Sequence, residues 1–281
     1  MNISIIIPVY NEASQLDACL RAIALQTVAP LEVIVVDNNS TDNSVAVAES
    51  YSFVRLLHES KQGVVHARTR GFNAARGDIL GRIDADTIMP DDWVATLKEI
   101  FSNKNVDATS GIAGYYNLAA AGIFNAGDLR MRRYLAKYLK NTMYLWGANM
   151  AVRKTAWNLI CNEVCYKNGI HEDYDIALHL QKHGGVVTFD ERLKVAVSSR
   201  RIDVGCLEFL RYTMTSSRTY SQHGIAHDWL WRSVTLSAAI TYVPGHIMHR
   251  GYDAALHRFT LRKLFSPKTT IPRVDPTTNV A

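Results

Sequence analysis

Cysteine is scarce in this sequence. The 281 residues include four cysteines, Cys19, Cys161, Cys165 and Cys206, and no two of them form a Cys-x-x-Cys motif. Small secreted scaffolds depend on many paired cysteines, and thiolate zinc sites need closely spaced pairs. We therefore expect a reducing, cytoplasmic compartment and no zinc site.

Long hydrophobic runs are absent as well. The longest apolar stretch, residues 234–248, contains Pro244 and is shorter than the ~20 residues that a membrane-spanning helix needs. At the N-terminus no basic segment precedes the apolar run, and Pro8 ends that run after the length of one strand. We expect no secretory signal, and a protein that is soluble or peripheral to a membrane.

The sequence does contain enough apolar residues for a full core. Hydrophobic residues make up 48% of the chain, which suits one large domain or one domain with an extension. Apolar runs at 3–8, 31–36, 53–57 and 79–83, of which the first two are rich in β-branched residues, predict strands, with helical segments between them. This alternation predicts an α/β fold with a mostly parallel sheet covered by helices on both faces.

Glycine-rich phosphate loops are missing from this sheet. A dinucleotide site needs Gly-x-Gly-x-x-Gly after the first strand, but the chain reads Pro-Val-Tyr-Asn-Glu-Ala from Pro8. A Gly-x-x-x-x-Gly-Lys-Ser/Thr loop is absent too. These absences exclude the Rossmann and P-loop types of site. Asp37, at the end of the second strand, is placed to accept a hydrogen bond from a ribose or a base.

Two carboxylates follow the fourth strand. Asp84 and Asp86 are separated by one small residue, so in an extended segment they point the same way, toward the edge where open α/β sheets bind ligands. Two adjacent carboxylates suit Mn²⁺ or Mg²⁺ bridging to the phosphates of a substrate. The alternative is a polar turn into the next helix, with Asp91 or Asp92 as its cap.

Positive charge gathers at the C-terminal end. The net charge is +5, and from Gly205 onward nine lysines and arginines face four acids. Half of the ten histidines lie there as well. This basic segment suits an anionic membrane surface or an acceptor phosphate, and the alternative is ordinary solvated helix faces. We expect no nucleic-acid partner.

Six motifs in order resemble those of family 2 glycosyltransferases, which have the GT-A fold. They lie at residues 4–12, 35–42, 67–71, 83–86, 146–153 and 172–180. The resemblance covers about residues 1–200 and implies a GT-A domain at 1–204, with a nucleotide-binding half at 1–90 and an acceptor half at 91–204. A basic helical extension at 205–281 follows, and we expect its tail to be flexible from about residue 266.

The resemblance implies a role for each matched residue. Pro8, Tyr10, Glu12, Asp37, Arg68 and Asp84 would bind the nucleotide. Asp86 would bind the metal directly, with Asp84 nearby, and Asp173 would be the catalytic base. Trp146, Gly147, Asn149 and Glu172 would lie on the acceptor side.

Histidines recur every four positions near the sixth motif. His171, Asp175, His179 and His183 would line one helix face and imitate a metal site, but such a face is more often exposed surface. Some GT-A enzymes use a late histidine as a further metal ligand. We take His223 as the candidate for that role, beside Asp86.

The resemblance also implies the reaction. It would be transfer of one sugar, with inversion, from a nucleoside-diphosphate sugar, with UDP favoured, to a hydroxyl of a glycan or lipid-linked acceptor in cell-surface polysaccharide, glycolipid or other glycan synthesis. The chain lacks the Gln-x-x-Arg-Trp motif of processive members. Peripheral attachment at the inner face of the cytoplasmic membrane would fit such an acceptor, as would a basic helix expected within residues 115–142.

Two alternatives and one departure from the family pattern remain. The alternatives are a catalytically inactive nucleotide-sugar-binding module and a sugar nucleotidyltransferase, although the latter needs a glycine-rich basic loop after the first strand, which is absent. The departure is Arg82, which stands in the fourth strand where the family pattern is apolar. We expect it to pair with an acid or to mark a donor subgroup.

Overall fold

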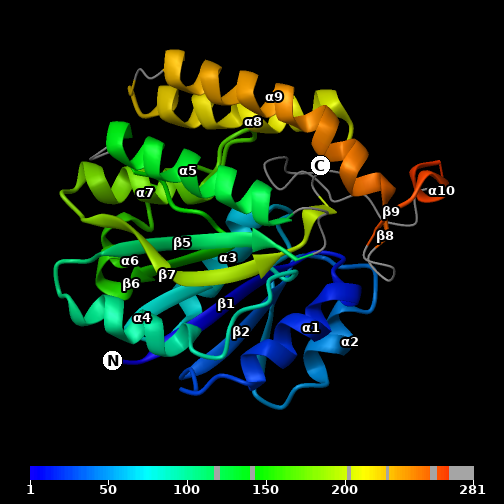
Figure 1. Ribbon diagram of the computed structural model, residues 1–281. Helices are drawn as coiled ribbons and strands as arrows, with labels where there is room; N and C mark the ends of the chain where they lie inside the picture. Colours follow the sequence, from blue (N-terminus) through cyan, green and yellow to red (C-terminus); the bar gives the residue numbers. More distant parts are fainter. Residues whose placement is uncertain (117–120, 140–142, 201–203, 226–227, 254–257, 266–281) are drawn as a thin grey trace.

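The computed structural model describes residues 1–116, 121–139, 143–200, 204–225, 228–253 and 258–265. A seven-stranded sheet forms its centre (Figure 1). The expected flexible tail from residue 266 lies outside the described residues. No described helix is long and apolar enough to cross a membrane.

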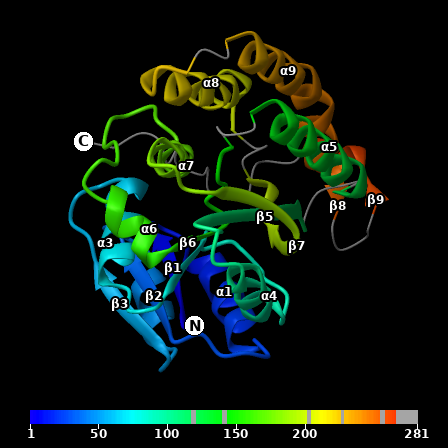
Figure 2. The same ribbon diagram turned by 90° about the vertical axis from the view of Figure 1, so that its left-hand side faces the viewer.

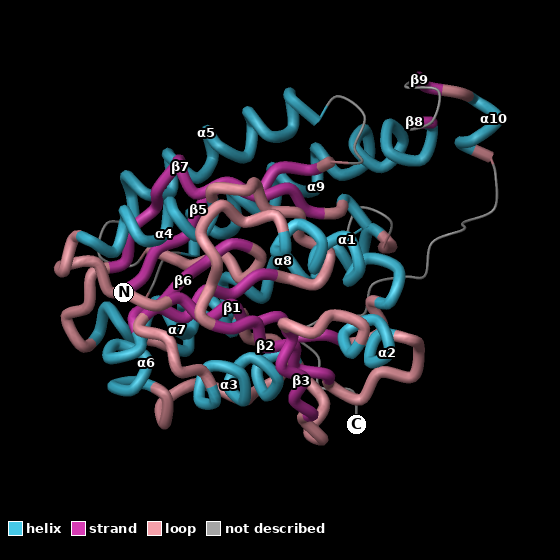
Figure 3. Tube along the Cα trace, turned by 90° about the horizontal axis from the view of Figure 1, so that it is seen from below, coloured by secondary structure: helices cyan, strands magenta, loops and turns pink. Residues whose placement is uncertain are grey.

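The sheet runs in the order β3-β2-β1-β4-β6-β5-β7, and Figure 3 shows β3 at the bottom and β7 at the top. Strands β1 to β4 are parallel, β6 is antiparallel to both of its neighbours, and β5 is parallel to β7. The expected mostly parallel sheet is thus confirmed. The strands are β1 Ile3–Val9, β2 Glu32–Asp37, β3 Val54–His58, β4 Ile79–Ile83, β5 Ala108–Tyr115, β6 Asn149–Arg153 and β7 Val187–Val197, with a separate pair β8 Tyr252–Asp253 and β9 Arg258–Phe259.

Helices cover both faces of the sheet, as Figure 2 shows with α3 and α6 on one side and α1 and α4 on the other. Each layer has its own apolar core, one around Trp93 and Leu16 and one around Trp157 and Phe72. The helices are α1 Ala13–Ala24, α2 Ser44–Glu49, α3 Val64–Ala74, α4 Trp93–Ser102, α5 Ala121–Leu139, α6 Lys154–Ile160, α7 Glu172–Lys182, α8 Cys206–Gln222, α9 Asp228–Gly251 and α10 Leu261–Leu264.

The C-terminal part is helical, as expected. Helices α8 and α9 lie side by side above α5 and α7 (Figure 1). A third apolar cluster joins them to the rest of the molecule, with Leu135 from α5, Leu178 from α7, Tyr220 from α8 and Trp231 from α9. The extension therefore packs directly on α7, the helix that begins at Glu172.

The loops after β1 and β2 are bound to each other. Asn11 and Asn39 adopt left-handed conformations, with φ of 54° and 64°, which asparagine tolerates better than most residues. The Asn11 side chain accepts a hydrogen bond from the Thr41 N–H at 2.8 Å, and Asp42 accepts one from the Ala13 N–H at 3.0 Å. These bonds hold the loops at the carboxyl ends of β1 and β2 as one rigid edge.

Candidate active site at the carboxyl edge of the sheet

Asp86, three residues after the end of β4, forms an ion pair with an arginine side chain. Its side chain is 1% exposed, and Oδ2 lies 3.2 Å from Nη2 of Arg200, which follows β7. The same nitrogen lies 2.6 Å from Oε2 of Glu12, which follows β1. One guanidinium thus bridges two carboxylates from different strand ends.

Asp84 has a different partner. Its Oδ1 lies 3.0 Å from Nη2 of Arg82, and its side chain is 19% exposed. The two carboxylates were expected to face one pocket together, but each one pairs with its own arginine. The turn between them explains this, since the Thr87 N–H donates to the Asp84 carbonyl and the segment is not extended.

Arg82 joins the carboxylate pair to the N-terminus of α7. Its Nη1 lies 2.8 Å from Oε1 of Glu172, and the arginine side chain is only 4% exposed. The prediction that Arg82 pairs with an acid is confirmed for two acids. A Cβ on Gly147 would overlap the Arg82 guanidinium, so a larger residue there would require the guanidinium to move.

Asp173 lies beside this network. Its Oδ2 accepts a hydrogen bond from the Gly147 N–H at 2.8 Å, and Oδ1 accepts one from the Tyr174 N–H at 2.9 Å. Burial, and then the negative charge of Glu172, raise the pKa of Asp173 to about 7. Glu172 instead turns to Arg82, so the two neighbouring acids have separate partners, and Asp173 has the pKa that suits a general base at neutral pH.

The expected nucleotide-binding residues from β1 and β2 lie at the same edge. Pro8 is in β1 and pairs with Val36, and Tyr10 follows, half-buried. Asp37 ends β2, where Oδ1 accepts from the Ser40 N–H at 3.2 Å and Oδ2 lies 3.4 Å from His58. Their contact with a nucleotide stays a prediction.

Arg68 occupies a different place from the expected one. It was expected on the base or diphosphate side, but its side chain is completely buried between α3 and α7. Nη1 donates to the Glu172 carbonyl at 3.1 Å, and the guanidinium lies over the Phe72 and Trp157 rings. Burial lowers the pKa of Arg68 to about 10. Arg68 therefore supports the N-terminus of α7 from within the core.

The side chain of Asn149, which was expected on the acceptor side, makes its hydrogen bonds within the core of the protein. Its Nδ2 donates to the carbonyls of Ile112 and Leu193, and its Oδ1 accepts from Nε1 of Trp93, all at 2.9 Å. These bonds use the side-chain amide to join β5, β6, β7 and α4. Trp146, half-buried just before β6, donates its backbone N–H to the Ser110 hydroxyl at 2.9 Å.

His223 differs from its expected position beside Asp86. Its Nε2 lies 2.8 Å from Oδ1 of Asp175, and His179 lies 3.4 Å from the same oxygen. Asp175 and Asp173 are two residues apart on α7, so they point about 200° apart. The expectation of an exposed histidine face holds for His183 alone, since Asp175 is fully buried, His171 is 5% exposed and His179 is half-buried.

Sequence reasoning missed Arg200. It lies 114 residues from Asp86, and no local periodicity links the two. The available signal was weak: two consecutive arginines, at 200 and 201, follow a strand that ends at the same edge as β4.

Glu12 and Asp86 converge on one nitrogen of Arg200 near the place where a divalent cation was expected, whereas Asp84 turns to Arg82. Glu12, Asp84 and Asp86 supply only carboxylates, which suit Mn²⁺ or Mg²⁺ better than a softer ion. The Arg200 guanidinium already makes cationic contacts with two of them. The residues at this edge therefore fit a hard divalent cation.

The sequence profile of glycosyl transferase family 2 matches residues 4–159, more than half of the chain. A second profile, glycosyl transferase family group 2, matches residues 82–256. Glycosyltransferase GlyG of Streptococcus pneumoniae is 34% identical over 120 residues, 41% of this chain and 39% of GlyG. The uncharacterized glycosyltransferase YibD of Escherichia coli is 41% identical over 88 residues, 30% of this chain and 26% of YibD. These alignments span less than two fifths of either relative.

Solved structures share the fold. The mannosyltransferase PcManGT from Pyrobaculum calidifontis, in complex with GDP-Man and Mn²⁺, superposes with a TM-score of 0.56 at 18% identity, covering 86% of this chain and 75% of that one. S. aureus TarS 1-349, in complex with UDP-GlcNAc, gives a TM-score of 0.57 at 15% identity, covering 76% and 64%. The GT-A fold expected from the motifs is confirmed.

Proposed function

Because this chain belongs to glycosyl transferase family 2, we propose that it moves one sugar, with inversion, from a nucleoside-diphosphate sugar to an acceptor hydroxyl. The observation that carries the proposal is the double contact of Arg82 with Asp84 and Glu172. This arginine links Asp84, one of the two carboxylates after β4, to the helix end that holds a candidate base. This contact supports the proposal that donor binding and proton removal share one site.

Asp173 is the proposed base. It accepts the proton of the acceptor hydroxyl while that oxygen forms a bond to the anomeric carbon, and the bond from that carbon to the diphosphate oxygen breaks. The Gly147 and Tyr174 N–H groups hold both carboxylate oxygens of Asp173 in place. A positioned base of this kind contributes ~10² to 10⁴ in rate.

Asp86, with Asp84 and Glu12, would hold the divalent cation, and Mn²⁺ is our first choice over Mg²⁺. Bound there, such an ion supplies positive charge that stabilises the leaving diphosphate. Arg200 already lies among these carboxylates and would add a second positive charge at the diphosphate. Glu172 keeps Arg82 in place and raises the pKa of Asp173.

For the donor we propose a UDP-sugar, which the family resemblance favours. The solved neighbours carry GDP-Man in one case and UDP-GlcNAc in another, so the base must be tested. We propose a glycan or lipid-linked acceptor at the inner face of the cytoplasmic membrane and addition of a single sugar per encounter.

Ligand-induced thermal stabilisation tests the donor and the metal together. The wild-type chain is screened with UDP-, GDP- and other nucleotide sugars, each with Mn²⁺, with Mg²⁺ and with chelator. We expect stabilisation by a UDP-sugar with Mn²⁺, lost in chelator and in Asp86→Ala. Equal stabilisation in chelator and in Mn²⁺ would show that the metal role is wrong.

Turnover separates an enzyme from an inactive binding module. The donor identified in the screen is incubated with candidate acceptors, and the anomeric configuration of the product is read by NMR. We expect one sugar added per acceptor with inverted configuration. If the donor binds but its sugar is transferred neither to any acceptor class nor, slowly, to water, the result would favour the inactive binding module.

A further inference from the structure

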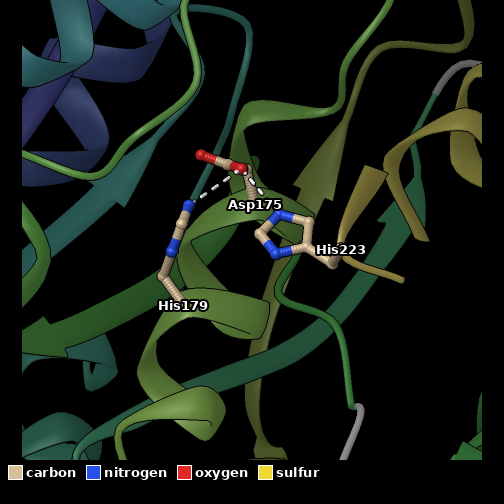
Figure 4. Close-up of side chains that lie close together, drawn as sticks. All are labelled: Asp175, His179 and His223. Carbon is tan, nitrogen blue, oxygen red and sulfur yellow. Dashed lines mark hydrogen bonds and ion pairs between the residues drawn. The ribbon is translucent and has the colours of Figure 1, made fainter. Parts of the chain in front are cut away.

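A second set of potential metal ligands lies on the opposite side of α7 from Asp173. Asp175 and His179 are four residues apart and lie on one face of this helix, and His223 caps the end of α8 (Figure 4). Their side chains are 1%, 12% and 10% exposed. The three residues, which we call the α7–α8 cluster, thus form a buried contact between the GT-A core and the C-terminal extension.

The donor atoms of the α7–α8 cluster converge. Oδ1 of Asp175 lies 2.8 Å from Nε2 of His223 and 3.4 Å from Nε2 of His179. The donor atoms of the three residues all lie within 4.8 Å of one another. In a tetrahedral zinc site with bonds of ~2.0–2.1 Å, neighbouring ligand atoms are about 3.3 Å apart. Only small side-chain shifts would therefore bring all three donors to one ion.

Residues around the α7–α8 cluster hold its donors in this orientation. Oε2 of Glu163 lies 3.3 Å from Nδ1 of His179, an ionic contact without hydrogen-bond geometry, on the side of the ring away from Asp175. The Cys165 N–H donates to Oδ2 of Asp175 at 2.8 Å and leaves Oδ1 toward the histidines. A carboxylate behind a ligand histidine is the usual outer partner in zinc sites.

We propose that Asp175, His179 and His223 form a binding site for Zn²⁺ that fastens α8 to α7. Two imidazole nitrogens and one carboxylate suit Zn²⁺, whereas the all-carboxylate set around Asp86 suits Mn²⁺ or Mg²⁺. With three protein ligands, the fourth position is left to water. The site is separate from the proposed donor site and does not depend on the transferase activity. It also replaces our expectation that the chain has no zinc site.

The ion would act on the active site through α7. This helix carries Asp173 at its first turn and Asp175 and His179 on its opposite face. Fastening the middle of α7 to the end of α8 would restrict movement of the helix end that holds the base. The rival explanation is a hydrogen-bonded cluster in which a protonated histidine supplies the positive charge beside Asp175.

Metal titration separates these explanations. The full-length chain is stripped with chelator and then titrated with Co²⁺, whose visible absorption reports tetrahedral nitrogen and oxygen ligands, and with Zn²⁺ against a chromophoric competitor. We expect one tightly bound Zn²⁺ per chain, with the same affinity, in the wild type and in Asp86→Ala. His223→Gln, which keeps a polar side chain of similar reach, should lower Zn²⁺ affinity at least ~100-fold and remove the Co²⁺ bands.

His183→Ala is the matched control. His183 caps the end of the same helix and also contacts Glu163, at 2.7 Å, but lies outside the three-residue cluster. It should bind Zn²⁺ like the wild type. Circular dichroism of each metal-free variant checks that it is folded, and if His223→Gln is unfolded, His179→Gln takes its place.

Two results would overturn the proposal. One is Zn²⁺ affinity in His223→Gln equal to that of the wild type, and the other is a folded wild type that binds no Zn²⁺ in competition with a weak chelator. Neither result bears on donor binding, which Mn²⁺ and nucleotide sugar report separately. Conversely, loss of nucleotide-sugar binding by the wild type would leave the zinc titration unchanged.

Discussion

The Asp173 carboxylate combines burial with two backbone hydrogen bonds, and this combination predicts its pH behaviour. Asp173→Asn keeps the shape and removes the base, so we expect turnover to fall at least ~100-fold, while nucleoside-diphosphate affinity stays within a few fold. Because the base must be ionised and its pKa is about 7, the wild-type rate should rise with pH through about 7. The measurement is the pH profile of turnover at saturating donor.

The same pKa sets the sign of a stability change. The pKa of Asp173 is raised in the folded protein, so its contribution to the free energy of unfolding is fully present below the ordinary aspartate value and is lost as pH rises through about 7. Asp173→Asn should flatten the dependence of the unfolding midpoint on pH in that window. If Asp173→Asn transfers sugar at the wild-type rate, Asp173 is not the base and another residue must have that role.

Gly147→Ala is predicted to destabilise the protein because of one contact. A Cβ there would overlap the Arg82 guanidinium and would push it away from Glu172, breaking a buried ion pair at a cost of roughly 3–5 kcal/mol. Gly147→Ala should therefore lower the free energy of unfolding in urea by an amount of this order. It should also lower turnover, since Glu172 precedes Asp173.

Gly127→Ala is the matched control for that substitution. Gly127 lies in α5, and a Cβ there would meet no atom within 4 Å. Alanine is favoured over glycine in a helix by up to ~1 kcal/mol, so this variant should be as stable as the wild type or more so. Similar losses in both variants would contradict the role given to Arg82.

At the scale of elements, the sequence predicted the strands whose formation depends on a local pattern of apolar residues. Strands β1 to β4 follow from apolar runs, and the position of Asp86 follows from its place three residues after the end of β4. The antiparallel β6 has no such signature, because its direction is set by its neighbours in the sheet. Arg68 and Asn149 were assigned to ligands, yet their polar groups satisfy buried backbone and side-chain partners that only the tertiary structure brings near.

Arg200 links the end of β7 to the ends of β1 and β4, and it pairs with Glu12 and Asp86, two of the carboxylates proposed to hold a divalent cation. In Arg200→Gln the competing charge is gone, so Mn²⁺ affinity without nucleotide should rise about tenfold, since losing one charge-assisted hydrogen bond of ~1.5 kcal/mol corresponds to that factor. Turnover should fall, because the diphosphate loses a positive partner. Electron paramagnetic resonance of free Mn²⁺ measures the first effect.

Arg192→Gln provides the comparison for Arg200→Gln. Arg192 lies in β7 and pairs with Asp190 and Glu99. Arg192→Gln removes the same charge from the chain as Arg200→Gln, but Arg192 does not pair with Glu12 or Asp86. Unchanged Mn²⁺ affinity in Arg200→Gln, or an equal rise in both variants, would show that the guanidinium does not compete with the cation.

At the scale of the whole molecule, one outer helix presents an apolar stripe. Leu236, Ile240, Val243 and Ile247 on α9 are 62%, 66%, 54% and 45% exposed, and their spacing places them on one face. Basic residues flank the stripe, with Arg232 on α9 and Arg258 and Arg262 beyond it, all exposed. The charge excess predicted from the sequence thus lies beside exposed apolar side chains that the sequence did not single out.

This arrangement predicts binding to an anionic membrane surface with α9 lying in its plane. Buried apolar area contributes about 25 cal/mol per Å², and each nearby basic residue contributes ~1 kcal/mol on such a surface. The wild type should sediment with phosphatidylserine-containing vesicles, less so at high salt, and should stay in the supernatant with neutral vesicles. The double variant Leu236→Glu, Ile240→Glu should lose most of this binding.

Leu25→Glu is the control for the apolar stripe, because Leu25 is 72% exposed at the end of α1, which lies on the other side of the molecule from α9 (Figure 1). It adds negative charge at an exposed leucine without altering α9, and should sediment nearly as the wild type does. If charge alone held the protein to the vesicles, Leu25→Glu and either single glutamate on α9 would weaken binding equally. If the stripe enters the interface, only the α9 variants lose binding that persists at high salt. Equal recovery of the wild type in the supernatant with both kinds of vesicle would show that the protein does not bind an anionic membrane. The apolar stripe on α9 would then be better explained as a contact surface for a protein partner.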